Sequence, residues 1–374
     1  MLIRIQGQTK NYDWGSKELI PNFFGTSESN DKIAEIWFGT HPLGESVSDP
    51  GDVPLSKLID KRLGFLVKLL AASQSLSIQV HPNQIQAQRG FEKEHKLGIS
   101  LDDPARVYKD SSHKPEALIA LTQFHALCGF RPRAELTQVF TCFGKSESEF
   151  EVLAQDLASG EPLEQIFKSL IGNTALATRF LQTVPVTVPD LLAQRGRDLV
   201  AKLLEQYPGD TGALVALMLN EVELSPGEAI FLPAGNIHAY LSGLGLEVMA
   251  ASDNVLRCGL TPKHIDLAEL VKIADFRELE NPKITLKKLA EGLTEFPVAV
   301  DDFRVYQAEV SGKNLLADID LPAAAIVVCT AGEVAISTSL DEREVLSKQQ
   351  VVYVAGAKKI SLSGSGTVFV VLGN

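Results

Sequence analysis

The chain has 374 residues, of which 45% are hydrophobic and 22% are charged, a composition typical of a soluble globular protein with two or three domains. Its formal net charge of −12, from 35 Lys and Arg against 47 Asp and Glu, disfavours nucleic acids and anionic membrane surfaces as partners. The four cysteines are scattered, and no segment is typical of a secretory signal or a membrane span, so we predict a cytoplasmic protein with reduced thiols.

Residues 1–130 contain short apolar stretches separated by turn signals, a pattern that predicts β-strands. One predicted strand is Leu76–Val80, and the polar residues 83–94 after it favour a helix. Side chains at i and i+2 of a strand point to the same face, so Gln79 and His81 can both reach one metal ion.

A third candidate ligand follows a polar loop. Glu116 begins the apolar stretch Ala117–Leu121, which predicts another strand. Its carboxylate could therefore enter the same cavity as Gln79 and His81. The three side chains are then candidate ligands of one metal ion.

The middle of the chain changes character. Residues 133–220 carry apolar side chains at i, i+3 and i+4 spacing, which predicts a helical insertion within a β domain. Strand patterns return afterwards, with one further helix over residues 264–276. We therefore predict a discontinuous β domain over 1–132 and 221–285, a helical domain over 133–220 and a C-terminal β domain over 286–374.

A turn motif with one histidine follows the helical block. Gly227, Pro233, Gly235 and His238 bracket the apolar strand Ala229–Leu232 and a tight turn, which resembles the second sequence motif of the cupin β-barrels, whose histidine is a metal ligand. With the three earlier candidates it supplies two imidazole nitrogens and two oxygens. That set favours zinc and also suits iron, cobalt or manganese.

A weak internal repeat appears near the C-terminus. Leu346–Ala357 can be laid under Leu224–Gly235, and Ile360 then takes the position of His238. The repeat predicts a second β-barrel of similar build without a metal site.

Three segments in chain order carry a family resemblance: Ser75–Pro82, Tyr108–Glu116 and His238–Lys263. They resemble the type I mannose-6-phosphate isomerases (phosphomannose isomerases), zinc-dependent enzymes of the cupin superfamily. The resemblance implies a mainly β fold with an α-helical insertion: two cupin-like jelly-roll barrels plus a helical domain. One departure is Ser112, where the family usually has asparagine, and it concerns a local hydrogen bond.

The resemblance also implies roles for individual residues. One zinc ion per chain would be bound by four ligands: Gln79, His81, Glu116 and His238. The residues matching catalytic or substrate-positioning residues of the family are Arg257, Asp253, Lys114 and His113. The residues matching positions that can hold the substrate phosphate are Ser77 and Lys68.

The implied reaction interconverts D-mannose 6-phosphate and D-fructose 6-phosphate through a cis-enediol, which requires a base and stabilisation of charge on oxygen. Arg257 is an unsuitable base because the pKa of its guanidinium exceeds ~12, so we expect it to hold oxyanions. Asp253, His113 and a zinc-bound water are the candidate bases. The expected partner is a small sugar phosphate, and we predict a monomer. The alternative is a metal cupin that is not an isomerase, either an oxygenase or a sugar-binding protein.

Overall fold

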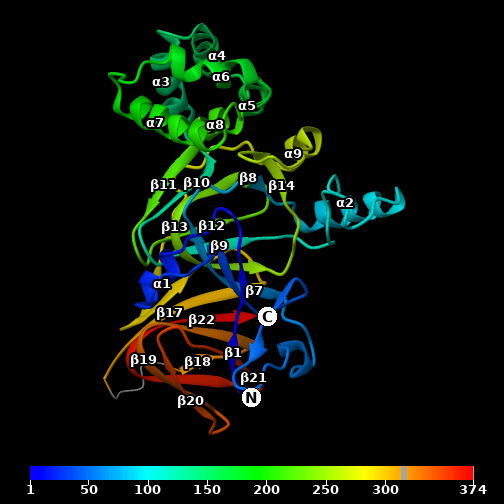
Figure 1. Cartoon of the computed structure of the whole chain (residues 1–374), viewed down its shortest axis with the longest axis vertical. Coiled ribbons are helices and arrows are strands. Elements are labelled where there is room, and N and C mark those ends of the chain that lie inside the picture. Colours follow the sequence, from blue (N-terminus) through cyan, green and yellow to red (C-terminus); the bar gives the residue numbers. More distant parts are fainter. Residues whose placement is uncertain (313–317, 374) are drawn as a thin grey trace.

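The computed structural model describes residues 1–312 and 318–373 and is elongated (Figure 1). Helices gather at one end, and a β-sheet lies in the middle. A second sheet lies at the other end, in the half of the molecule that holds both termini. We call these parts the helical unit (residues 133–218), the central sheet and the C-terminal sheet. The predicted mainly β fold with a helical insertion is confirmed.

The central sheet has ten strands within the described residues. They are β2 (Gln8–Lys10), β3 (Glu35–Phe38), β7 (Phe65–Ala72), β8 (Ile78–Val80), β9 (Glu116–Ala120), β10 (Phe124–Phe130), β11 (Leu219–Leu224), β12 (Ala229–Leu232), β13 (His238–Ala250) and β14 (Leu256–Gly259). Their main order is β11-β10-β13-β7-β3-β2, all antiparallel, while β9 pairs with β12 and β13, and β8 pairs with β13 and β14.

Short elements lie outside the two large sheets. They are α1 (Leu19–Phe24), β4 (Thr40–His41), β5 (Gly44–Glu45), η1 (Leu55–Lys57), α2 (Gln84–Lys96) and α9 (Leu267–Ile273). The helices predicted over 83–94 and 264–276 correspond to α2 and α9. A capping box fixes the start of α2, because Asn83 and Gln86 each accept a hydrogen bond from the other's main-chain N–H.

Strand β13 connects the two halves of the central sheet. Its first residues pair with β10, and its later residues pair with both β7 and β9. Gly243 lies at the change of partners with φ +123, and a Cβ added there would lie 2.6 Å from the main-chain oxygen of Gln123. Glycine is required here because side chains rarely tolerate that φ and no space remains for one.

The helical unit comprises α3 (Arg133–Gly144), α4 (Ser148–Ser159), α5 (Leu163–Ile171), α6 (Thr174–Thr183), α7 (Leu191–Gln206), α8 (Gly212–Val215) and η2 (Ala216–Met218). It is inserted between neighbouring strands, since Phe130 of β10 pairs with Leu219 of β11. Its apolar core continues into the central sheet through Ile78 and Val80. No helix in the described ranges is long and apolar enough to cross a membrane.

The C-terminal sheet also has ten strands in the described part of the chain. They are β1 (Leu2–Gln6), β6 (Val47–Ser48), β15 (Lys287–Ala290), β16 (Leu293–Phe296), β17 (Phe303–Gly312), β18 (Asp318–Asp320), β19 (Ala324–Thr338), β20 (Arg343–Ser347), β21 (Val351–Ala355) and β22 (Lys359–Gly373). The predicted boundaries assign β1 to the other β domain, but β1 pairs with β21 from Leu2↔Val354 to Ile5↔Val351. Ile360 is buried in an apolar core of this sheet.

The two sheets share one apolar core. Phe65 and Val248 of the central sheet belong to the same buried cluster as Phe303 and Val328 of the C-terminal sheet. The C-terminal sheet therefore supports the central sheet directly, and loss of a large side chain between them should destabilise both.

We expect Phe303→Ala to lower the free energy of unfolding by about 3–5 kcal/mol, because it removes a fully buried ring and leaves a cavity. Urea denaturation measures the change. Leu340→Ala in the turn after β19 is the control, since this side chain is 56% exposed and should cost under about 0.5 kcal/mol. Equal costs for the two variants would contradict a shared core.

Candidate metal centre and active site

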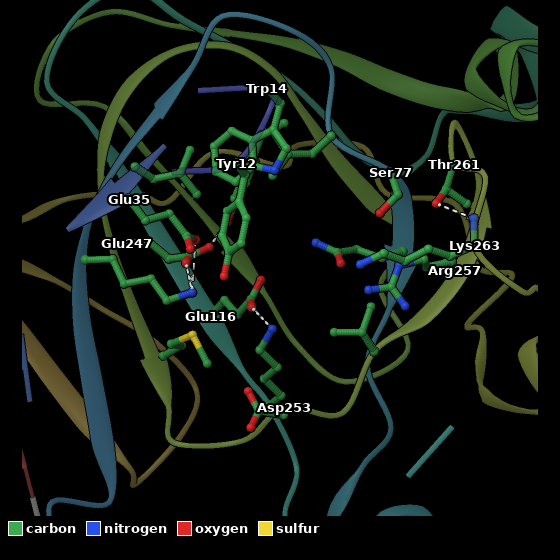
Figure 2. Close-up of a pocket in the computed structure, with 18 of the residues that line it drawn as sticks. Tyr12, Trp14, Glu35, Ser77, Glu116, Glu247, Asp253, Arg257, Thr261 and Lys263 are labelled. Carbon is green, nitrogen blue, oxygen red and sulfur yellow. Dashed lines mark hydrogen bonds and ion pairs between the residues drawn. The ribbon is translucent and has the colours of Figure 1, made fainter. Parts of the chain in front are cut away.

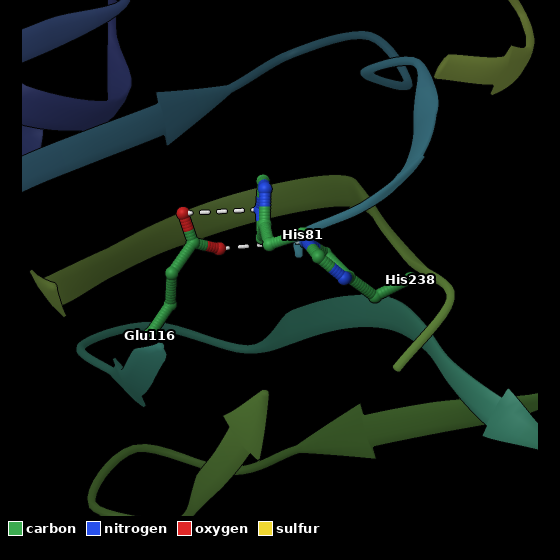
Figure 3. A group of neighbouring side chains, drawn as sticks. All are labelled: His81, Glu116 and His238. Carbon is green, nitrogen blue, oxygen red and sulfur yellow. Dashed lines mark ion pairs between the residues drawn. The ribbon is translucent and has the colours of Figure 1, made fainter. Parts of the chain in front are cut away.

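Three buried side chains of the central sheet converge (Figure 3). His81 directly follows β8, Glu116 begins β9 and His238 begins β13. Glu116 bridges the two rings, because its Oε1 is 3.4 Å from His81 Nε2 and its Oε2 is 3.4 Å from His238 Nε2. One ligand atom of each residue lies within 4.8 Å of the others, a separation that a single metal ion can bridge.

The polar atoms that face the centre of this cluster suit a metal ion. His81 Nε2, Glu116 Oε2 and His238 Nε2 are buried without a hydrogen-bond partner, which is costly unless a ligand satisfies them. The other ring nitrogens face carbonyl oxygens, with His81 Nδ1 2.7 Å from Asn254 O and His238 Nδ1 3.0 Å from Asn236 O. Because a carbonyl only accepts, each Nδ1 holds the proton and each Nε2 directs a lone pair inward.

The charges of the cluster are also those that a metal requires. Burial lowers the pKa of His81 to about 4, so its ring is neutral at neutral pH. Burial alone would raise the pKa of Glu116, but the positive charge of Lys114 outweighs it and holds that pKa well below its ordinary value. Neutral imidazoles and an ionised carboxylate are the forms that bind divalent metals.

Gln79, the predicted fourth ligand, lies on β8 two residues before His81. In the sheet register it is opposite both His238 and Arg257, and its side chain lines the adjoining cavity. Its role as a ligand stays a prediction.

A cavity of about 620 Å³ opens beside the cluster (Figure 2). It is lined by most of the predicted site residues: Lys68, Ser77, Gln79, Lys114, Glu116, Asp253 and Arg257. It is also lined by residues that were not predicted as site residues, among them Tyr12, Trp14, Glu35, Tyr240, Glu247 and Lys263.

One wall of the cavity holds a buried group of charges. Lys68 Nζ lies 2.9 Å from Glu247 Oε2 and 3.3 Å from Glu35 Oε1. Burial alone would lower the pKa of Lys68, but the attraction of these two carboxylates raises it above its ordinary value. The same burial raises the pKa of Glu247. Lys68 is therefore a paired cation, and its predicted contact with phosphate would compete with two carboxylates.

The opposite wall is cationic. Figure 2 shows Arg257 and Lys263 beside Ser77, across the cavity from Glu35 and Glu247. Burial lowers the pKa of Arg257, and repulsion by Arg257 lowers the pKa of Lys263. Among the described residues neither cation has an ion-pair partner, so this wall favours an anion.

Two further predicted residues lie close to the metal cluster. Lys114 is buried, and its Nζ is 2.9 Å from Glu116 Oε1. Asp253 lines the cavity with a side chain that is 37% exposed, and its Oδ2 is 3.4 Å from His41 Nε2. Both residues can therefore reach a molecule bound in the cavity.

Comparisons with known proteins identify the family. Residues 2–133 match the family model described as phosphomannose isomerase type I, catalytic domain. The chain is 34% identical to the mannose-6-phosphate isomerase of Escherichia coli K12 and 35% identical to that of Salmonella typhimurium LT2, in each case over 97% of both chains. The chain belongs to the mannose-6-phosphate isomerase family.

Solved structures of the family share this fold. The Salmonella typhimurium mannose 6-phosphate isomerase described as bound to substrate (fructose 6-phosphate) and zinc has a TM-score of 0.87 at 33% identity, covering 100% of this chain and 99% of that one. A zinc-bound structure of mannose 6-phosphate isomerase has the same TM-score at 32% identity. The expected resemblance to type I mannose-6-phosphate isomerases is confirmed.

His113 is the one predicted site residue of this isomerase fold that neither lines the cavity nor belongs to the metal cluster. Its ring faces the bend just before β17, where Nε2 lies 2.9 Å from Oδ1 of Asp302. This hydrogen bond raises the pKa of His113 above the ordinary 6.5. The proton-transfer role of His113 stays a prediction.

This contact predicts a pH-dependent stability. Because the pKa of His113 is raised in the folded state, the stabilisation is complete below the ordinary pKa and is lost as pH rises through the folded pKa. Asp302→Asn should therefore lower the free energy of unfolding by up to about 1 kcal/mol at about pH 5.5 and hardly at all at about pH 9. Urea denaturation at both pH values measures this.

The neighbouring, exposed Asp301 provides a matched control. Asp301→Asn makes the same charge change without this contact, so its effect should not differ between the two pH values. An Asp302→Asn effect that grows with pH would contradict the assignment.

Ser112, the departure from the family pattern, lies in a well-connected loop. Its main-chain oxygen accepts hydrogen bonds from Asn254 Nδ2 and Ser252 Oγ, and its N–H donates to Asp110 Oδ1. These bonds involve the main chain of Ser112, so the loop does not depend on an asparagine side chain there.

Glu247 was not predicted as a site residue, although the sequence contains a signal for a buried ion pair at this position. It is a charged residue within the apolar stretch Leu244–Ala250 of β13, as Lys68 is within Phe65–Ala72 of β7. The two are directly opposite in the sheet register. Two buried charges of opposite sign on neighbouring strands are a signal for such a pair.

Proposed function

We propose that this protein is a zinc-dependent aldose–ketose isomerase, with one zinc ion per chain, that interconverts D-mannose 6-phosphate and D-fructose 6-phosphate. The observation that carries this proposal is the buried cluster of His81, Glu116 and His238, whose inward-facing atoms have no other partner. The names of the relatives support it, as does the related structure described as bound to fructose 6-phosphate and zinc.

The residues present fit zinc. His81, Glu116 and His238 would hold the ion. Gln79, which is opposite His238 in the sheet register, would be the fourth ligand. When bound, zinc supplies Lewis-acid stabilisation of negative charge on the sugar oxygens.

The phosphate group would bind at the cationic wall. Arg257 offers a planar fork of donors that matches phosphate oxygens, and Lys263 adds a second positive charge. The Ser77 hydroxyl adds a short polar group at the same wall. The carboxylates beside Lys68 weigh against a phosphate there, so we place Lys68 near the uncharged part of the sugar.

Isomerisation transfers one hydrogen from C2 of mannose 6-phosphate to C1 and moves the hydroxyl proton of O2 to O1, through a cis-enediol. Asp253 lines the cavity and can act as the base. Glu247 is a further candidate because burial raises its pKa toward the pH of operation. Lys114 beside the metal cluster would donate hydrogen bonds to the enediolate oxygens.

We also keep the predicted organisation as a proposal. It comprises a catalytic domain over 1–132 and 221–285, a helical domain over 133–220 and a C-terminal domain over 286–374, with a cupin-like barrel in each β domain. The exception is β1, which pairs within the C-terminal sheet. The four cysteines are free and buried, which supports a reducing compartment such as the cytoplasm. We propose a monomer, which light scattering of the purified protein would test.

The test is direct conversion of mannose 6-phosphate, with fructose 6-phosphate measured as product. We expect conversion in both directions that stops after chelation. An oxygenase would instead consume oxygen, and a sugar-binding protein would bind without turnover. No conversion by protein with a full complement of zinc would overturn the proposal.

A further inference from the structure

We propose that the helical unit sets the geometry of the cationic wall, which holds Ser77, Arg257 and Lys263 and would bind the substrate phosphate. Asp210 is the positioning residue through which the helical unit does so. The structural element responsible is the turn between α7 and α8, residues 206–212, which we call the α7–α8 turn. The proposal rests on the proposed function, because it concerns how the substrate phosphate is held.

The first contact of the turn is with the segment just before β8, which carries Ser77. Ser75, two residues earlier, donates its N–H to Gln206 Oε1 at 3.1 Å. The Tyr207 hydroxyl donates to the main-chain oxygen of Ser75 at 2.6 Å, and Tyr207 itself lines the cavity. Both polar groups of the Ser75 main chain are therefore bound to the end of α7.

The second contact is with the segment that carries Lys263. Asp210 Oδ2 accepts the N–H of Thr261 at 3.2 Å, while its Oδ1 accepts the N–H of Gly212 at 2.7 Å. Thr261 Oγ1 in turn accepts the N–H of Lys263 at 3.1 Å. A single carboxylate therefore links the α7–α8 turn to the main chain before Lys263.

The turn and the strand of Arg257 also approach closely. A Cβ added to Gly212 would lie 2.8 Å from Gly259 Cα, and one added to Gly259 would lie 2.5 Å from Gly212 Cα. Both positions need glycine, because a side chain on either residue would push the two backbones apart. Gly259 is two residues after Arg257 on β14, so the contact fixes that strand.

These contacts meet at one place. Ser77, Arg257, Thr261 and Lys263 lie together on one side of the cavity in Figure 2. The α7–α8 turn contacts the main chain at Ser75, Gly259 and Thr261. Each of the four residues is one of these contacts or lies two residues from one. Binding groups that act together must be held to fractions of an ångström by the groups behind them. The helical unit thus contributes to substrate binding although most of its helices lie at the end of the molecule beyond the central sheet (Figure 1).

The test compares Asp210→Ala with the wild-type protein, using mannose 6-phosphate as substrate and inorganic phosphate as a competitive inhibitor. We expect the KM and the phosphate inhibition constant to rise in parallel by about tenfold, the value of a lost charge-assisted hydrogen bond. We expect kcat to change by less than about threefold and zinc content to stay unchanged, because the metal cluster is not touched.

The direction of the change separates positioning from charge. Removing a carboxylate near two cations would by charge alone strengthen phosphate binding, whereas lost positioning weakens it. Asp210→Asn keeps one acceptor oxygen and should raise both constants by a smaller factor, which also serves if the alanine variant fails to fold. Asp190→Ala is the matched control, because Asp190 also accepts a main-chain N–H in the helical unit but lies at the start of α7.

Unchanged constants in folded Asp210 variants, or constants that fall, would overturn the proposal. A loss of kcat at unchanged KM would do so too. The wild-type protein is assayed first, so a failure of the proposed function would appear there as absent turnover, before any variant is compared.

Discussion

His238→Ala should abolish metal binding and lower kcat/KM by about a thousandfold or more. The substitution removes one of two inward-facing imidazoles from a cluster of three buried ligands, and a metal that stabilises developing charge contributes several kcal/mol to catalysis. Elemental analysis of the purified variant and initial rates with mannose 6-phosphate measure the two effects.

Two companion variants make the His238 result specific. His264→Ala removes an exposed histidine and should keep both metal and activity. Glu116→Gln keeps the size of the side chain but removes the charge beside Lys114, so it should lose metal without opening a cavity. A His238→Ala protein that keeps its zinc and its turnover would refute the metal centre.

Arg257→Ala should leave the zinc content unchanged and lower kcat/KM by about two orders of magnitude or more. Arg257 is half-buried on the cationic wall, and no described residue pairs with it. We therefore expect its donors to bind the substrate phosphate or the enediolate, and charge-assisted bidentate contacts of this kind are strong. Steady-state kinetics and metal analysis measure the change.

Arg257→Lys should recover only part of the loss, because lysine keeps the charge without the planar fork. Arg304→Ala on β17 is the control, since that arginine is exposed and belongs to the C-terminal sheet. Loss of zinc from Arg257→Ala would mean that the arginine supports the metal centre instead of binding substrate.

The metal cluster was accessible from the sequence because its residues sit at the ends of strands. Glu116 and His238 each begin an apolar stretch, and His81 ends one before a proline. Local sequence patterns were therefore enough to identify them as candidate ligands. The family resemblance then joined them into one site. The helical block was equally clear, since its apolar spacing is local.

The cavity walls were less accessible, because they depend on register between distant strands. Lys68 is paired by Glu35 and Glu247, which lie on the two strands that flank β7. A single sequence does not state which strands are neighbours. The pairing of β1 with β21, at opposite ends of the chain, was missed for the same reason.

The contacts between the helical unit and the cationic wall were not predictable either. Asp210 follows a Pro-Gly pair between two helices, and locally it looks like an ordinary turn residue. Only the fold brings it to Thr261, 51 residues further along the chain.

The most direct measurement is a zinc titration of chelated protein with mannose 6-phosphate as substrate. We predict that the metal-free protein is inactive, that formation of fructose 6-phosphate rises linearly with added zinc, and that it reaches a plateau at one ion per chain. Full turnover by the metal-free protein, or no turnover by the zinc-saturated protein, would contradict a zinc-dependent isomerase built on His81, Glu116 and His238.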